Sequence, residues 1–227
     1  MWLPSLLAPR PSPVDPLAHP ATAHPIARRR VLFTLATLVA GTVLLAFTLH
    51  ARQGSTAFVV LGVATAAAWV LGALAAAPVP LLPDRARSGR IVVQAAALGV
   101  ASFAVFAAAY QATKHVPVLS GALHSVLGKA DAAPRPVVLA VTLVNGLAEE
   151  VFFRGALLAG LAVRRPAVVA GLLYVAATAA TGNLALVIAA VVMGTIFVRE
   201  RLTSGGVLAP IVTHLTWSTL MLLALPR

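Results

Sequence analysis

The sequence contains no cysteine, which excludes disulfides and cysteine-ligated metal sites. Acidic residues are scarce too: the 227 residues include six aspartates and glutamates but 17 lysines and arginines. Charged residues make up 10% of the chain and hydrophobic residues 60%, and the mean hydropathy is +0.95. This composition excludes an ordinary soluble domain and is typical of a polytopic membrane protein. The net charge of +11 does not indicate a nucleic-acid partner, because the arginines flank apolar segments.

We predict an all-α, polytopic membrane helix bundle with about seven transmembrane helices. Three parts are expected: a proline-rich flexible tail at 1–27, transmembrane helices with a connecting loop at 28–136, and a helical core at 137–225. Because a span needs about 20 apolar residues, the predicted crossings are 31–50, 56–77, 91–110, 137–163, 167–181, 184–198 and 204–225. The fifth and sixth are short, so a hairpin that does not fully cross is the alternative. Residues 116–127 are apolar but too short to cross, which favours a surface or re-entrant helix.

The basic residues predict the orientation. With the N-terminus inside, eleven lysines and arginines lie in inner segments and five in outer segments, while Arg154 is intramembrane. This bias follows the positive-inside rule and places the N-terminus inside and the C-terminus outside. We expect an integral protein of a bacterial cell membrane.

The segment 137–163 carries the only two carboxylates in an apolar core, Glu149 and Glu150, with Arg154 four residues on. On an ideal helix Glu150 lies about 100° and Arg154 about 140° from Glu149. Glu150 and Arg154 therefore share a face and can neutralise each other, which leaves Glu149 without a cation. Desolvation and the neighbouring carboxylate favour the protonated form of Glu149, as suits a general base near neutral pH. The alternative is a buried ion-pair network that only fixes helix packing.

His214 is the one histidine well inside a predicted span. Counting about 1.5 Å per residue places it and Glu149 at similar depth, near the midplane, and Ser218 lies one turn beyond it. There is no His-Glu-x-x-His zinc motif, no Gly-x-Ser-x-Gly nucleophile motif and no glycine-rich phosphate loop. One histidine and one free glutamate are too few ligands for a catalytic zinc site, so no cofactor is expected.

The motif Glu149-Glu150-x-x-x-Arg154, followed about sixty residues later by Leu208-Ala-Pro-Ile-Val-Thr-His214, resembles the CPBP family of intramembrane proteases, which includes the CAAX prenyl endopeptidases. The similarity covers about 137–225. The resemblance implies that Glu149 activates the attacking water, that Glu150 and Arg154 support it, and that His214 donates to the oxyanion. The family's Phe-x-x-x-His motif corresponds here to Tyr174-Val-Ala-Ala-Thr178, and Ser218 replaces an asparagine or aspartate. Thr178 and Ser218 can still donate hydrogen bonds, but they are poor metal ligands.

The function expected from this resemblance is a glutamate-dependent intramembrane endopeptidase. Its partners would be the lipid bilayer and a membrane-associated peptide or protein substrate of CAAX type or a related kind. A catalytically silent member that binds a peptide or membrane partner is the second hypothesis, motivated by Thr178. A small transporter or channel component that uses the intramembrane glutamates, Arg154 and His214 for ions or protons is the third, although the sequence has no inverted repeat of the kind many transporters carry.

Overall fold

The computed structural model describes residues 25–52, 54–76, 79–80, 88–123 and 134–225. Most of the predicted tail, residues 1–24, lies outside these ranges. Within them every regular element is a helix, as the composition predicted. The elements are α1 Pro25–His50, α2 Thr56–Ala76, α3 Ser88–Thr113, α5 Arg135–Glu150, η2 Val151–Leu157, α6 Leu158–Gly160, α7 Pro166–Ala179, α8 Leu184–Ser204 and α9 Leu208–Ala224.

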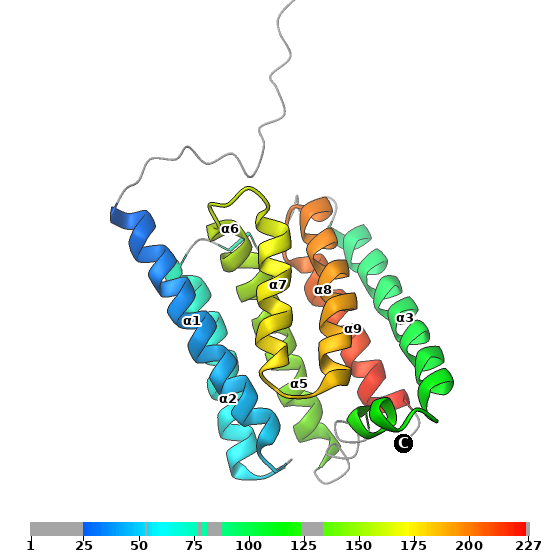
Figure 1. The fold of residues 1–227 in the computed structure, drawn as a ribbon. Helices are drawn as coiled ribbons and strands as arrows, with labels where there is room; N and C mark the ends of the chain where they lie inside the picture. The colour runs from blue at the N-terminus through cyan, green and yellow to red at the C-terminus, as the bar shows by residue number, and fades with distance from the viewer. Residues whose placement is uncertain (1–24, 53, 77–78, 81–87, 124–133, 226–227) are drawn as a thin grey trace, which may run out of the picture.

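The helices run alternately down and up the bundle (Figure 1). The end where α1, α7 and α9 finish and α5 and α8 begin is called the lower end here. The end where α1, α3, α7 and α9 begin is called the upper end. Helices α1 and α2 form one antiparallel pair and α3 packs on α9, while α5 contacts both α2 and α9. Helices α7 and α8 pack against each other, and both contact η2. The central helix is therefore surrounded by protein on several sides.

Within the described ranges, four helices are long and apolar enough to cross a membrane: Arg29–His50, Thr56–Ala76, Ser88–Thr113 and Arg135–Gly160. Pro166–Ala179 and Leu208–Ala224 are shorter apolar helices. The predicted helical membrane bundle is confirmed, whereas the count of seven crossings and the inward N-terminus stay predictions. Of the apolar segment 116–127, residues 117–123 are helical and 124–127 lie outside the described part.

Some boundaries differ from those predicted. Helix α1 begins at Pro25, inside the predicted tail. Proline is well tolerated at the first helical position, because its missing N–H would have no partner there. The central helical run ends at Gly160 rather than Val163, since Leu161 has an extended backbone with φ −78° and ψ 106°. Helix α8 continues to Ser204, beyond the predicted end at Val198, and stops where Gly205 adopts a φ of 76°.

A π-helix follows the two glutamates directly. Residues Val151–Leu157 form η2, and all seven are buried. Such wider turns are rare and are frequently found at functional sites. The side chain of Arg201, from the end of α8, donates from Nε to the Arg154 carbonyl at 3.0 Å. This bond provides a partner for a carbonyl in the π-helical turn.

Glu200, near the upper end of α8, contacts Thr213 of α9, which in turn contacts Ala95 of α3. The Thr213 hydroxyl lies 2.7 Å from Glu200 Oε1 and 3.0 Å from the Ala95 carbonyl oxygen. A hydroxyl has one proton to donate, so both contacts are hydrogen bonds only when Glu200 is protonated and donates to Thr213. Burial raises the pKa of the Glu200 carboxyl from about 4.5 to about 7, which agrees with this arrangement.

Stability is therefore expected to depend on pH through Glu200. The folded protein holds this proton more tightly than the unfolded chain, so the stabilisation is complete below about pH 4.5 and is lost as the pH rises through about 7. Unfolding of the wild type and of Glu200→Gln in detergent, measured from pH 4.5 to 8, tests this. The wild type should lose stability relative to the variant across this range. Parallel pH profiles would contradict the assignment.

Candidate active site

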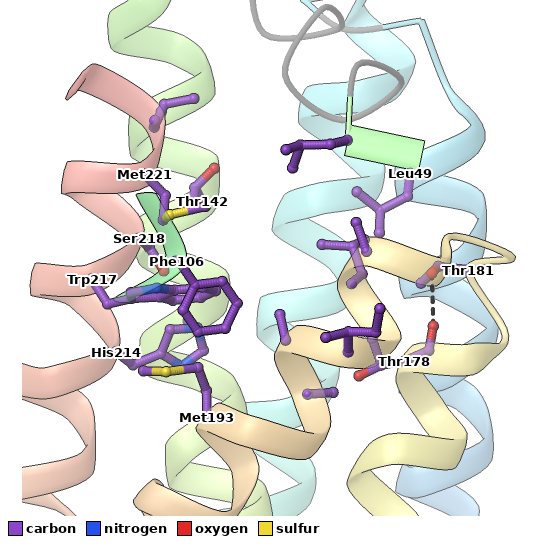
Figure 2. A pocket seen from close by; sticks show the side chains of 18 of the residues that line it. Leu49, Phe106, Thr142, Thr178, Thr181, Met193, His214, Trp217, Ser218 and Met221 are labelled. Carbon is purple, nitrogen blue, oxygen red and sulfur yellow. Dashed lines mark hydrogen bonds between the residues drawn. The ribbon is translucent and has the colours of Figure 1, made fainter. Parts of the chain in front are cut away.

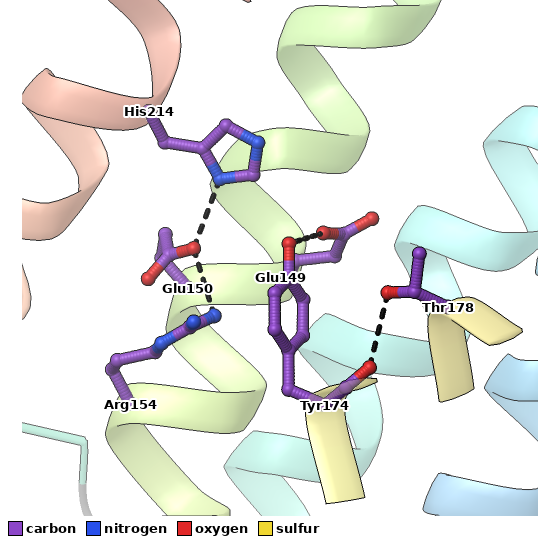
Figure 3. A network of polar contacts seen from close by, with 6 residues as sticks. All are labelled: Glu149, Glu150, Arg154, Tyr174, Thr178 and His214. Carbon is purple, nitrogen blue, oxygen red and sulfur yellow. Dashed lines mark hydrogen bonds and ion pairs between the residues drawn. The ribbon is translucent and has the colours of Figure 1, made fainter. Parts of the chain in front are cut away.

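Glu150 is the centre of a buried ionic cluster (Figure 3). Its side chain is 0% exposed, and its Oε1 accepts from Arg154 Nη1 at 3.0 Å and contacts His214 Nδ1 at 2.9 Å. The spacing of four residues predicted the Glu150–Arg154 pair, and the distance confirms that contact. One carboxylate oxygen of Glu150 therefore joins the side chains of Arg154 and His214.

The same contact shows which carboxylate His214 bonds. His214 was expected at a similar depth to Glu149, and its hydrogen bond is to the adjacent Glu150. The depth of a residue along its helix does not determine the direction in which its side chain points. Helix α9 packs on the face of α5 that carries Glu150. Counting residues along each helix therefore did not predict which of the two glutamates His214 bonds.

Arg154 is enclosed between aromatic rings. Its guanidinium carbon lies 4.1 Å from the Tyr174 ring centroid and 5.0 Å from that of Phe197, and the residue is 1% exposed. Its Nε and Nη2 atoms have no hydrogen-bond partner among the described residues. The ring faces supply electrostatic attraction in place of those bonds. Arg154 is therefore held as a buried cation with one anionic partner.

Glu149 points away from this pair, toward α7 (Figure 3). Its Oε2 accepts a hydrogen bond from the Tyr174 hydroxyl at 3.2 Å. Its other oxygen has no hydrogen-bond partner among the described residues, and the residue lines a cavity. The expectation that Glu149 lacks a direct cation partner agrees with the ion pairs found in the described part of the chain, which all involve Glu150.

The His214 ring is fixed on three sides. It stacks on Phe197 with centroids 4.8 Å apart, and Nδ1 is bound to Glu150. Gly146 lies against it: a Cβ there would come within 3.4 Å of ring atoms Cδ2 and Nε2. Within the described residues Nε2 has no hydrogen-bond partner, and His214 lines the same cavity as Glu149. One ring nitrogen therefore remains available for another group.

The cavity measures about 420 Å³ and reaches from these residues to the lower end of the bundle. Figure 2 shows its walls: His214, Trp217 and Ser218 lie on one side, and Thr178 and Thr181 on the opposite side. Most of the lining is aliphatic or aromatic. The few polar groups that converge on an apolar pocket are the usual signature of a binding or active site.

Thr178 and Ser218 differ in what they can donate. The Thr178 hydroxyl donates to the Tyr174 carbonyl at 3.0 Å, so it would have to break that bond to donate into the cavity. Ser218 Oγ has no hydrogen-bond partner among the described residues and lies one turn beyond His214. Of the six predicted site residues, Glu149, Glu150, Arg154 and His214 form one cluster, Ser218 is next to it, and Thr178 is on the far wall.

Two residues near the site were not predicted from the sequence. The Tyr174 hydroxyl is the one polar group bonded to Glu149 in the described part of the chain. Asn145, one turn before Glu149, donates from Nδ2 to the Gly62 and Val141 carbonyls, which leaves its Oδ1 buried without a partner. Tyr174 is the first residue of the stretch that corresponds to the family's Phe-x-x-x-His motif. Its place in that motif could have identified it as a site residue.

The residues present do not fit a metal site. Among the described residues no group of three histidine, cysteine, aspartate or glutamate side chains comes together. Nδ1 of His214 is bound to Glu150, and the Thr178 hydroxyl proton is bound to a carbonyl. A catalytic zinc normally needs three protein ligands, so we derive no step through a metal.

Comparison with known proteins identifies the region that holds this cluster. Residues 131–220 match the family model described as "Type II CAAX prenyl endopeptidase Rce1-like". No curated protein and no solved structure matched the chain. The matched family is a protease family that acts on membrane-associated protein or peptide substrates. This match over residues 131–220 supports membership of the CPBP family of intramembrane proteases, which the motifs around Glu149 and His214 resemble.

Proposed function

We propose that the protein is an intramembrane endopeptidase in which Glu149 activates a water molecule to cleave a membrane-associated peptide. One observation carries the proposal: the two adjacent glutamates have different surroundings. Glu150 forms an ion pair with Arg154 and contacts His214, while Glu149 faces the cavity with the Tyr174 hydroxyl as its single bonded partner. Two carboxylates in different surroundings can perform different chemical roles within one active site.

In the proposed reaction, Glu149 takes a proton from water as the water oxygen attacks the carbonyl carbon of the scissile amide. Negative charge then develops on the former carbonyl oxygen. As the C–N bond breaks, Glu149 passes the proton to the leaving nitrogen, which departs as an amine. One water is consumed, a carboxylic acid is formed, and the Glu149 carboxylate is restored.

His214 is the proposed donor to the oxyanion. Because Nδ1 contacts a carboxylate oxygen that also accepts from Arg154, Nδ1 is assigned as a donor. The other ring nitrogen, Nε2, has no hydrogen-bond partner among the described residues, and His214 lines the cavity. The proposed role requires a proton on Nε2 as well, because only an N–H can donate to the oxyanion. Ser218, which lines the cavity beside it, is the proposed second donor.

The substrate is proposed to be a peptide of CAAX type or a related membrane-associated peptide. The test is cleavage of membrane-anchored peptides, prenylated and unprenylated, by purified protein in detergent with and without a chelator. Product formation that the chelator leaves unchanged supports the mechanism. Loss of cleavage with the chelator would overturn the metal-free mechanism. Absence of cleavage by well-folded protein would overturn the enzymatic proposal in favour of a peptide-binding protein.

Tyr174→Phe is expected to lower kcat about tenfold with little change in KM. A hydrogen bond to a charged group contributes about 1.5–3 kcal/mol, and here it holds the Glu149 carboxylate in position. The ring contacts with Arg154 and Phe153 remain in the variant, so its stability should stay near that of the wild type. Tyr110→Phe is the matched control, since Tyr110 lines the same cavity far from Glu149. Equal kcat values for the two variants would contradict this role of Tyr174.

A further inference from the structure

Two aromatic side chains, called the aromatic wall here, line the cavity next to the proposed oxyanion donors. They are Phe106 of α3 and Trp217 of α9, and their ring centroids lie 5.2 Å apart in an edge-to-face arrangement. The Trp217 ring also lies beside the His214 ring, with centroids 6.2 Å apart. Figure 2 shows both rings on the same side of the cavity as His214 and Ser218. A substrate side chain near these donors would therefore meet the aromatic wall.

Close packing of α3 on α9 fixes the position of Phe106. A Cβ at Gly99 would come within 2.8 Å of Thr216 Cβ and 2.9 Å of the Thr213 carbonyl oxygen, so a side chain there would force the two helices apart. Phe106 follows Gly99 by seven residues, about two turns, and therefore lies on the same face of α3. The aromatic wall thus belongs to a close-packed helix pair rather than to a loop.

The rest of the lining favours an apolar substrate side chain. In the described part of the chain, Glu149 and His214 are the only acidic or basic residues that line the cavity. On the opposite wall, the Thr178 and Thr181 hydroxyls donate to the carbonyls of Tyr174 and Thr178. A charged substrate side chain would find no partner apart from the groups of the proposed reaction, and an unpaired buried charge is costly. Selection between substrates therefore depends on the size of an apolar side chain.

We propose that Phe106, backed by Trp217, is the specificity-determining residue that limits the size of the apolar substrate side chain beside the scissile bond. The position beside that bond rests on the proposed peptidase function, whereas the selection of a side chain by the aromatic wall does not. The Phe106 ring occupies space that a larger substrate side chain would need. One methylene group more or less in an apolar pocket changes kcat/KM by about 10–200-fold, so removal of a whole ring should change the preference strongly.

The test compares wild type, Phe106→Ala and Phe106→Leu on membrane-anchored peptides in which one valine at a time is replaced by phenylalanine. The measured quantity is the ratio of kcat/KM for the phenylalanine peptide to kcat/KM for the valine peptide. Phe106→Ala is expected to raise this ratio at least about tenfold at a position next to the cleaved bond, and Phe106→Leu by less. A folding defect would lower both rates together and leave the ratio unchanged. If Phe106→Ala does not fold, the ratio for Phe106→Leu decides.

Phe103→Ala is the matched control, since Phe103 lies on the same helix and does not line the cavity. Its ratios should equal those of the wild type. Peptide affinities of Glu149→Gln, with and without Phe106→Ala, give the corresponding binding ratios without cleavage. A shift in the binding ratios with no cleavage by the wild type would support the aromatic wall and overturn the peptidase. Unchanged ratios in a well-folded Phe106→Ala variant would overturn the role of Phe106, even if the wild type cleaves the peptides.

Discussion

Glu149→Gln is expected to abolish peptide cleavage, with a fall in kcat of at least about 10³-fold. The amide cannot take a proton from water, and general-base catalysis alone contributes about 10²–10⁴-fold. The fold should be retained, because the glutamine carbonyl can accept the same bond from Tyr174. The measurement is the rate of product formation from a membrane-anchored peptide by purified variant and wild type.

Glu200→Gln is the matched control for this loss. It makes the same chemical change in a partly buried glutamate that does not line the cavity, so the rate should remain near that of the wild type. Cleavage by a well-folded Glu149→Gln variant at the wild-type rate would show that another group is the base. Equal loss in both glutamine variants would indicate a general defect of folding.

Arg154→Met is expected to destabilise the protein by about 3–5 kcal/mol. Removing one member of a buried ion pair leaves the other charge uncompensated in a medium of low dielectric constant. Glu150 is fully buried, its remaining contact is His214, and Oε2 has no partner among the described residues. The variant also loses the cation between the rings of Tyr174 and Phe197. Unfolding by a graded increase of denaturing detergent measures the difference.

Two further variants separate the charge effect from the loss of packing. Arg199→Met makes the same substitution at an exposed position and should change stability by less than about 0.5 kcal/mol. The double variant Glu150→Gln, Arg154→Met removes both charges and should recover a large part of the loss. If the double variant is no more stable than Arg154→Met, uncompensated charge is not the cause.

The sequence predicted those features that depend on local spacing and composition. An apolar composition required helices that satisfy their own backbone hydrogen bonds in a membrane, and the helical bundle is observed. A separation of four residues places two side chains on one helix face, and Glu150 and Arg154 are in contact. The motifs around Glu149 and His214 indicated the family that residues 131–220 match.

Packing between distant segments decided the rest. The rotation of α9 about its axis brought His214 to Glu150, and α7 placed the Tyr174 hydroxyl on Glu149 across 25 positions of sequence. The cavity at the lower end likewise follows from how side chains of several helices fill the bundle. Periodicity describes each helix by itself. It contains no information on the angle at which one helix meets another, and that angle determines which glutamate is neutralised and which faces the cavity.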